Sequence, residues 1–272
     1  MKLIAKHFTN FVEHLPEDYV IERPEMVLFD YGHTLSHEDP YDRNAGINAL
    51  LDHLPDRTKL PLTDEEIYKF AEEFQLKVWD LCDKYRLEYY FQHFLQMLWG
   101  TLGQKPDMDL VEQEMTYWWN TSHAQPMEGI NELLAHLKSE GYRTAVLSNI
   151  SYSEAALRRR IAAIIPEHEF EFVLATSEVI VRKPSRRIFD IALRMADLPP
   201  SALWYCGDNA IADVQGAHGA EIRPVWYRSP HECDYHRDTE KIPPDLPYIQ
   251  ITEWRELGEI LAALPLRVAD FK

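Results

Sequence analysis

The sequence predicts an α/β protein with a doubly wound, Rossmann-like parallel sheet into which an α-helical cap is inserted. Short apolar runs alternate with amphipathic helical segments from about residue 126 onward. The stretch 41–120 is helical in character almost throughout, with no clear strand. It follows a single strand-like run, so it interrupts the α/β pattern just after its first strand. Alternating strands and helices are typical of a parallel sheet covered on both faces.

Each element is predicted from its own local pattern. Six apolar runs bounded by polar residues indicate strands at 26–29, 143–149, 170–176, 201–209, 222–227 and 248–252. Apolar residues at helical spacing indicate core helices at 128–142, 153–165, 185–198, 212–220 and 253–264. In the inserted region they indicate helices at 64–85, 87–103 and 107–120, the first begun by a capping box of Thr63 and Glu66. These elements predict an N-terminal extension at 1–25, a core at 26–36 and 126–268, and a cap at 37–125.

Composition limits the classes of partner. The chain has 272 residues, 46% of them apolar, and a net charge of −17. That charge repels phosphate backbones and anionic lipids, so we expect no nucleic-acid and no membrane partner. Three widely spaced cysteines, an odd number, fit free thiols in a reducing compartment, and no signal-peptide core is present. We therefore expect a cytoplasmic protein; the sequence does not indicate its oligomeric state.

Polar residues follow the predicted strands, where ligands of such sheets bind. Taken singly, each of these residues is compatible with an ordinary turn or helix cap. Together they suit phosphoryl transfer, which needs a carboxylate nucleophile, groups that hold the phosphate oxygens, and acids for Mg²⁺. The residues concerned are Asp30, Ser148, Asn149, Lys183, Asp208 and Asp213.

The order and context of these residues resemble the haloacid dehalogenase (HAD) superfamily of phosphohydrolases. FDYGHTL resembles its first motif, VLSNIS the second, RKPSRRIF the third and GDNAIADVQGA the fourth. The likeness covers 26–36 and 126 to about 264. The helical insertion resembles, in position and character, the family's C1 cap, whereas the stretch before Pro24 has no recognisable counterpart.

The resemblance implies a role for each matching residue. Asp30 would be the nucleophile, and Ser148 and Lys183 would complete the catalytic set by binding the phosphate. Mg²⁺ would be held by Asp30, the backbone carbonyl of Gly32 and Asp208, and the substrate would be a small phosphorylated metabolite. The remaining matches are Thr34, which would bond around the first turn and help bind substrate, Asn149, which would also bind substrate, and Asp213 and Asn209, which would support the metal ligands from behind.

One position departs from the family pattern. The phosphatases of the family usually carry a second aspartate two residues after the nucleophile, as general acid and base, and here that residue is Gly32. General acid–base catalysis typically contributes about 10²–10⁴ in rate. The unperturbed pKa of a histidine suits proton transfer at neutral pH, but in an extended chain His33 points away from the face of Asp30. A cap residue or a metal-bound water could supply the proton instead, or the natural substrate could have a good leaving group.

Two further functions compete with the phosphatase interpretation. The dehalogenases of the family also lack an aspartate at this position and need no metal, but the acids of GDNAIAD would then have little to do. A binding or regulatory protein on a weakened enzyme scaffold is the second possibility. Elsewhere, the arginines 158–160 are expected on a solvated helix face. His231, Cys233, His236 and Asp238 include zinc-type ligands without a second matching pair.

Overall fold

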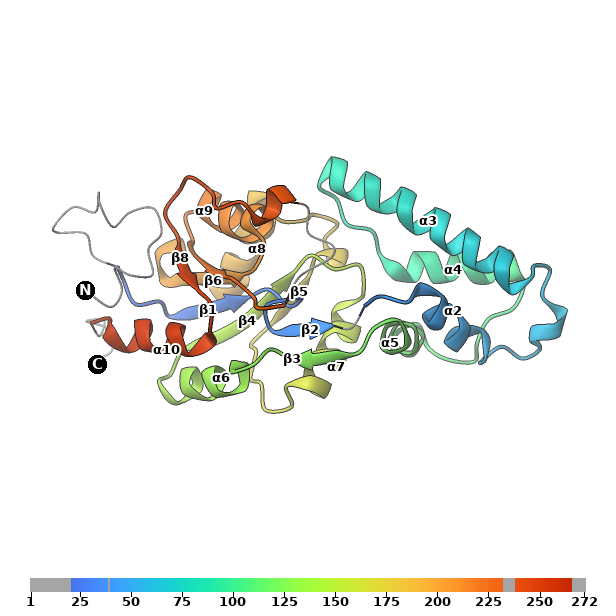
Figure 1. Cartoon of the computed structure of the whole chain (residues 1–272), viewed down its shortest axis with the longest axis horizontal. Coiled ribbons are helices and arrows are strands. Elements are labelled where there is room, and N and C mark those ends of the chain that lie inside the picture. The colour runs from blue at the N-terminus through green and yellow to red at the C-terminus, as the bar shows by residue number, and fades with distance from the viewer. Residues whose placement is uncertain (1–20, 39, 232–237, 266–272) are drawn as a thin grey trace.

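The computed structural model describes residues 21–38, 40–231 and 238–265, and its centre is a sheet of six parallel strands (Figure 1). The strand order is β5-β4-β1-β6-β7-β8, so β1 lies between β4 and β6. All six predicted strands are confirmed: β1 (Met26–Phe29), β4 (Arg143–Ser148), β5 (Val173–Ala175), β6 (Leu203–Gly207), β7 (Arg223–Tyr227) and β8 (Ile249–Ile251).

Helices cover both faces of this sheet, as the doubly wound prediction requires. Alternate residues of β1 illustrate the division, because Val27 and Phe29 pack with α6, α7 and α10, whereas Met26 and Leu28 pack with α8 and α9. Such alternation follows from the two-residue period of a strand. The covering helices are α6 (Ile130–Ser139), α7 (Glu154–Ile164), α8 (Arg186–Ala196), α9 (Gly216–Gly219) and α10 (Trp254–Ala263).

The insertion after β1 is helical and lies to one side of the sheet (Figure 1). Its longest helix, α3, begins with the predicted capping box, in which Thr63 and Glu66 bond to each other's backbone N–H groups at 2.8 and 3.3 Å. Helix α4 ends at Gly103, which adopts a left-handed φ of 69° that glycine tolerates. The helices are α2 (Arg43–Leu51), α3 (Asp64–Tyr85), α4 (Phe91–Leu102) and α5 (Leu110–Thr121).

Two short strands connect the insertion to the core. Strand β2 (Ser36–Glu38) leaves the core and pairs antiparallel with β3 (Ala124–Pro126), on which the chain returns. The sequence did not predict this pair. Each strand has three residues, too few for a period-2 pattern to be recognised.

Further short helices complete the chain. Those with a 3₁₀ form are η1 (Arg57–Lys59), η2 (Thr176–Glu178), η3 (Pro200–Ala202) and η5 (Asp238–Lys241), and η4 (Ala210–Gln215) is a π-helix. Of the predicted extension, 21–25 lies against the core, where the backbone N–H of Glu25 donates to the carbonyl of Ala202 at 2.7 Å; 1–20 lies outside the described residues. Within the described chain, no helix combines the length and the apolar character needed to cross a bilayer.

Candidate active site

Three parallel strands bring the predicted residues to one edge of the sheet. Phe29, the last residue of β1, is paired with Val146 of β4 and with Cys206 of β6. Asp30 follows Phe29 directly, Ser148 comes two residues after Val146, and Asp208 comes two residues after Cys206. The backbone N–H of Asp30 donates to the carbonyl of Cys206 at 2.8 Å, which fixes the start of the turn. Their proximity follows from parallel pairing.

Lys183 lies at the centre of the cluster and is almost completely buried. Its Nζ lies 2.8 Å from Asp30 Oδ1 and 2.6 Å from Asp213 Oδ1, and it donates to the hydroxyl of Tyr205 at 2.7 Å. Two of the three N–H donors bond to Asp213 and Tyr205, whereas Asp30 Oδ1 forms an ion pair with the ammonium and has no hydrogen-bond partner among the described residues. Burial alone lowers the pKa of Lys183, but Asp213 and Asp30 outweigh it and leave the pKa raised. The lysine is therefore held in its charged form.

Asp213 is fixed from several sides. Besides Lys183, which bonds to Oδ1, the backbone N–H of Asn209 donates to Oδ2 at 2.9 Å. The carboxylate packs over Gly207, where a Cβ would lie 2.3 Å from Asp213 Cγ, so this strand end requires glycine. Asn209 accepts from the N–H groups of Ile211 and Ala212 at 2.9 and 2.8 Å and so caps η4. Asp213 is therefore held between Lys183 and the backbone of Asn209, whose side chain is fixed in turn by η4.

The acids of this edge form a group suited to a hard cation. One carboxylate oxygen each of Asp30, Asp208 and Asp213 lies within 4.8 Å of the others. Burial, and next to it the charges of Asp213 and Asp30, raise the pKa of Asp208 well above its ordinary value. When ionised, three acids beside one lysine leave a net charge of about −2, which a divalent ion would neutralise. Oxygen donors of this kind fit Mg²⁺.

The other predicted substrate contacts differ from one another. Ser148 is 3% exposed, and its hydroxyl makes no hydrogen bond to any residue that the structure describes. The side chain of Asn149, by contrast, holds the main chain of Lys183, accepting from its N–H at 2.8 Å and donating to its carbonyl at 3.2 Å. The amide of Asn149 therefore positions the main chain of Lys183, and its contact with substrate stays a prediction.

Thr34 lacks the predicted bond around the first turn, while its contact with substrate stays a prediction. Its hydroxyl is buried and has no hydrogen-bond partner among the described residues, so it does not bond around the turn. The backbone closes the turn instead, because the N–H groups of Thr34, Leu35 and Ser36 all point to the carbonyl of Tyr31 at 3.4, 2.9 and 3.1 Å. Main-chain bonds have replaced the side-chain bond expected of the threonine.

The position of the missing acid is open. A Cβ built on Gly32 would meet no atom within 4 Å, and its φ lies outside the left-handed region. The residue with positive φ is His33, at 53°. The turn is therefore not extended at His33, which weakens the argument that this side chain points away from Asp30. Gly32 leaves room where an aspartate would stand.

For two residues the sequence-based prediction was incomplete or wrong: Tyr205 was not identified as a site residue, and Arg160 was expected on an exposed helix face. Tyr205 lies within the apolar strand β6, where its buried hydroxyl bonds to Lys183 and donates to the carbonyl of Leu147 at 2.8 Å. A tyrosine inside an apolar strand is a usable signal, since its buried hydroxyl needs a partner. Arg160 is 0% exposed, so the expectation of a solvated face is wrong for it. Arg158 and Arg159 do reach solvent.

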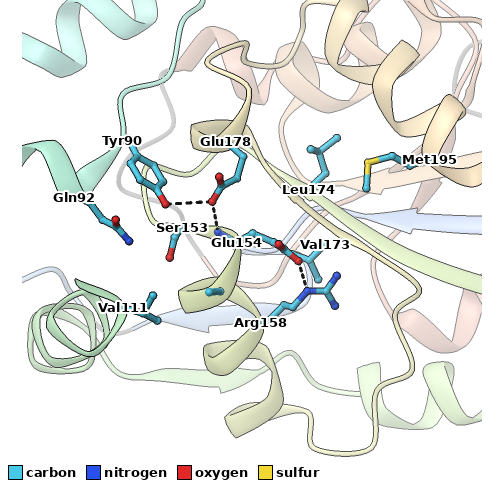
Figure 2. A pocket seen from close by; sticks show the side chains of 11 residues that line it. Tyr90, Gln92, Val111, Ser153, Glu154, Arg158, Val173, Leu174, Glu178 and Met195 are labelled. Carbon is cyan, nitrogen blue, oxygen red and sulfur yellow. Dashed lines mark hydrogen bonds and ion pairs between the residues drawn. The ribbon is translucent and has the colours of Figure 1, made fainter. Parts of the chain in front are cut away.

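A separate cavity of about 370 Å³ lies at the seam between the insertion and the core (Figure 2). Its lining includes Tyr90, Ser153 and Glu178 but not Asp30 or Lys183, so it is distinct from the acidic cluster. The hydroxyl of Tyr90 and the backbone N–H at the start of α7 both bond to Glu178, at 3.4 and 2.9 Å. Of the zinc-type residues, Cys233 and His236 lie outside the described residues, while His231 stacks on His37 at 4.1 Å.

Comparison with known proteins gives two kinds of likeness. Among curated proteins, the chain is 29% identical over 213 residues to a glyceraldehyde 3-phosphate phosphatase of Methanothermobacter thermautotrophicus, covering 75% of this chain and 86% of that one. It is 25% identical over 243 residues to an enzyme of the same name from Methanopyrus kandleri, covering 88% and 98%. Among solved structures, a 2-haloacid dehalogenase from Pseudomonas syringae pv. Tomato DC3000 superposes with a TM-score of 0.58 at 22% identity, covering 88% and 98%, which is a likeness of fold.

A family model matches most of the chain and not only its short motifs. The family model described as haloacid dehalogenase-like hydrolase matches residues 42–227, which include most of the insertion and the second, third and fourth polar motifs. The first motif precedes the matched residues. Asp30 nevertheless lies at the same end of the sheet as the matched motifs, because β1 pairs with β4 and β6. On this match, the chain belongs to the haloacid dehalogenase-like hydrolase family.

Proposed function

We propose that this protein is a phosphohydrolase that removes the phosphate group of a small metabolite through an aspartyl-phosphate on Asp30. The observation that carries the proposal is the buried contact of Lys183 with Asp30 and Asp213, beside a third acid, Asp208. A metal-free dehalogenase would gain nothing from Asp208. Curated relatives named as phosphatases support the same conclusion.

The first step assigned to these residues is nucleophilic. The carboxylate of Asp30 attacks phosphorus, the bond from phosphorus to the leaving-group oxygen breaks, and the phosphoryl group is transferred to Asp30. Ser148, whose hydroxyl is free of other bonds among the described residues, donates to a phosphate oxygen. Lys183 supplies fixed positive charge beside the same oxygens. Water then cleaves the acyl phosphate, which releases inorganic phosphate and restores the carboxylate.

The metal site is proposed at the front of the acidic cluster. Both oxygens of Asp213 already accept hydrogen bonds, so the remaining ligands are Asp30, Asp208 and the carbonyl of Gly32. When bound there, Mg²⁺ would add positive charge next to the transferring phosphate. Asp213 acts behind these ligands by holding Lys183.

The protonation of the leaving group is the weak point of the site. No side chain at Gly32 donates a proton to the departing oxygen, so the barrier should depend steeply on the leaving group. Acyl and aryl phosphates, whose leaving groups are weak bases, should react faster than alkyl esters. The relatives are named for an alkyl ester, glyceraldehyde 3-phosphate, which makes that compound the informative comparison.

The test is a phosphate-release assay with acetyl phosphate, p-nitrophenyl phosphate and glyceraldehyde 3-phosphate, each with Mg²⁺ and with EDTA. We expect Mg²⁺-dependent release, fastest from acetyl phosphate, and none from the Asp30→Asn variant. A chloride-release assay with 2-chloropropionate in EDTA tests dehalogenation in parallel, and we expect no chloride. Failure to release phosphate from any substrate, together with retained binding of one, would favour a binding protein.

A further inference from the structure

Arg160 is a fully buried charged side chain at the seam between core and insertion. It lies on α7, the core helix that follows Ser148, and is 0% exposed. Its guanidinium lies 4.3 Å from the ring centre of Trp118 and 4.4 Å from that of Trp119, both on α5. Both tryptophans belong to the inserted region, so a core arginine is enclosed by insertion residues. Cation–aromatic contacts are strongest when desolvated in this way.

The same guanidinium bonds to both connections between core and insertion. Nη2 donates to the carbonyl of Ser122 at 2.8 Å and to Glu38 Oε1 at 3.2 Å. Glu38 is the last residue of β2, on which the chain leaves the core, and Ser122 precedes β3, on which it returns. The hydroxyl of Ser122 also donates to Glu38 Oε2 at 2.8 Å. The two crossings are thus joined through one arginine.

Arg160 also reaches the turn that carries the nucleophile. Its Nε donates to the hydroxyl of Tyr31 at 3.0 Å, and Tyr31 directly follows Asp30. That hydroxyl in turn donates to Glu38 Oε1 at 3.2 Å. The ring of Tyr31 packs edge-on against Trp118, with centroids 5.8 Å apart. The nucleophile turn, both crossings and α5 therefore all contact one side chain.

A second buried ionisable residue, Glu114, connects α5 to the N-terminus of α7. Glu114 of α5 is 0% exposed and accepts from the backbone N–H of Ser153, the N-cap of α7, at 2.8 Å and from Gln92 at 2.9 Å. Glu114 and Trp118 are four residues apart, so they lie on one face of α5. Burial raises the pKa of Glu114 although Ser153 and Gln92 lower it. Helix α5 is anchored to α7 at two points.

These contacts are better suited to fixing an orientation than to adding stability. Burying an ion pair costs about as much as the pair returns, and apolar residues of similar volume often stabilise as well. Arg160 even leaves one nitrogen, Nη1, buried without a hydrogen-bond partner among the described residues. Directional bonds, unlike apolar contacts, accept only one arrangement of the groups they join. The bonds of Arg160 therefore specify one arrangement of α5, β2 and Tyr31.

We propose that Arg160 is a positioning residue that fixes the orientation of the insertion relative to Asp30. It touches no reacting atom and acts through Tyr31, Glu38 and Ser122. The rate for a substrate whose leaving group extends from the phosphate toward the insertion should depend on this orientation. The rate for a substrate with a leaving group of only two carbons, such as acetyl phosphate, should not. The kinetic part of the proposal rests on the proposed phosphohydrolase function. Misplacement by about 1 Å at a distance from the chemistry can cost up to about 100-fold in rate.

The experiment compares Arg160→Met with Arg159→Met, which alters an exposed neighbour on the same helix. We expect Arg160→Met to lower kcat/KM for glyceraldehyde 3-phosphate by about 10- to 100-fold and for acetyl phosphate by less than about threefold. Arg159→Met should change neither. Tyr31→Phe, which removes only the acceptor hydroxyl, should show part of the loss and add little to Arg160→Met. Equal losses on both substrates, or no loss on either, would overturn the proposal.

A measurement without turnover keeps the two proposals separate. Amide hydrogen exchange should accelerate in α5 and around β2 and β3 in Arg160→Met, while β1, β4 and β6 exchange as in the parent. Arg159→Met should unfold cooperatively within about 4 °C of the parent. Arg160→Met should also unfold cooperatively, but at a lower temperature, because Glu38, whose side chain is 20% exposed, loses its charged partner. If the parent releases no phosphate from any substrate, the proposed function fails, and the exchange result alone decides the role of Arg160. Unchanged exchange in α5, β2 and β3 would refute it.

Discussion

The Nζ of Lys183 lies 2.8 Å from Oδ1 of Asp30, so the ammonium of the third motif touches the carboxylate of the first. Both groups are buried, with side-chain exposures of 1% and 12%. Lys183 is also 2.6 Å from Asp213, which makes it the counter-charge of two acids at once. Any change in this trio alters both the chemistry of Asp30 and the electrostatic stability of the sheet edge.

Asp30→Asn is expected to abolish phosphate release while the protein stays folded. An amide is a poor nucleophile, and loss of a nucleophile in other enzymes costs more than about a thousandfold in kcat. Since the variant removes one of three clustered acids, its melting temperature without Mg²⁺ should be no lower than the parent's. Steady-state release and thermal unfolding check this. Activity within about tenfold of the parent would remove Asp30 from its role.

Lys183→Met should destabilise the fold, because Asp30 and Asp213 would lose their buried counter-charge. Removing one partner of a buried pair costs about 3–5 kcal/mol. For a chain of this size that corresponds to a fall of roughly 10 °C in melting temperature. The control is Lys138→Met, which breaks an exposed pair with Glu169 and should shift it by no more than about 2 °C. Equal shifts in the two variants would contradict the central role of Lys183.

Gly32→Asp is expected to raise turnover of alkyl esters more than that of acyl phosphates. The added carboxyl group can protonate a leaving group, an effect worth about 10²–10⁴ in rate, and acyl phosphates need it least. The structure has room, since nothing lies within 4 Å of a Cβ there and φ is not left-handed. The measurement is kcat for glyceraldehyde 3-phosphate and acetyl phosphate. A parent that already turns over the alkyl ester at about ten per second or more needs no such acid, and His33→Ala becomes the next test.

Binding of Mg²⁺ should strengthen as the pH rises. Burial raises the pKa of Asp213 to about 6 and that of Asp208 well above its ordinary value. The metal-free fold therefore holds protons that the unfolded chain releases above about pH 4, and loses stability as the pH rises through about 6. Mg²⁺ binds ionised carboxylates, so its binding expels those protons.

The check is the gain in melting temperature on adding Mg²⁺, which should be small at about pH 5 and larger at about pH 8. Asp208→Asn, which removes a proposed ligand, should abolish most of this gain at both pH values. A gain that is independent of pH, or that survives in Asp208→Asn, would place the metal elsewhere.

Much of the fold was predictable because its signals are local. The apolar runs that become β1, β4 and β6, and the capping box of Thr63 and Glu66, depend on residues within a few positions of one another. The meeting of Asp30, Ser148 and Asp208 followed from parallel pairing alone, since each residue comes at or just after the end of its strand.

What could not be predicted depends on contacts between distant segments. Arg158, Arg159 and Arg160 look alike in sequence, but only Arg160 is buried. Two of its hydrogen-bond partners lie far away in the chain, in β2 and just before β3. Asn149 follows a strand like any candidate ligand, yet its amide is taken up by the main chain of Lys183. Such choices are made by tertiary packing, which propensity and periodicity do not contain.

The pairing of β2 with β3 also bears on how the gene could be edited. Glu38 and Ala124 face each other across an antiparallel ladder, and paired strands lie about 4.8 Å apart. A turn of two residues can span that distance, so the backbone of the core would close if everything between those two positions were excised. Different insertions could be transplanted into the same two splice points without re-registering the sheet. Arg160 would then limit which insertions are compatible with the core, since only an insertion that supplies hydrogen-bond acceptors or aromatic rings for the guanidinium would leave this buried charge with partners.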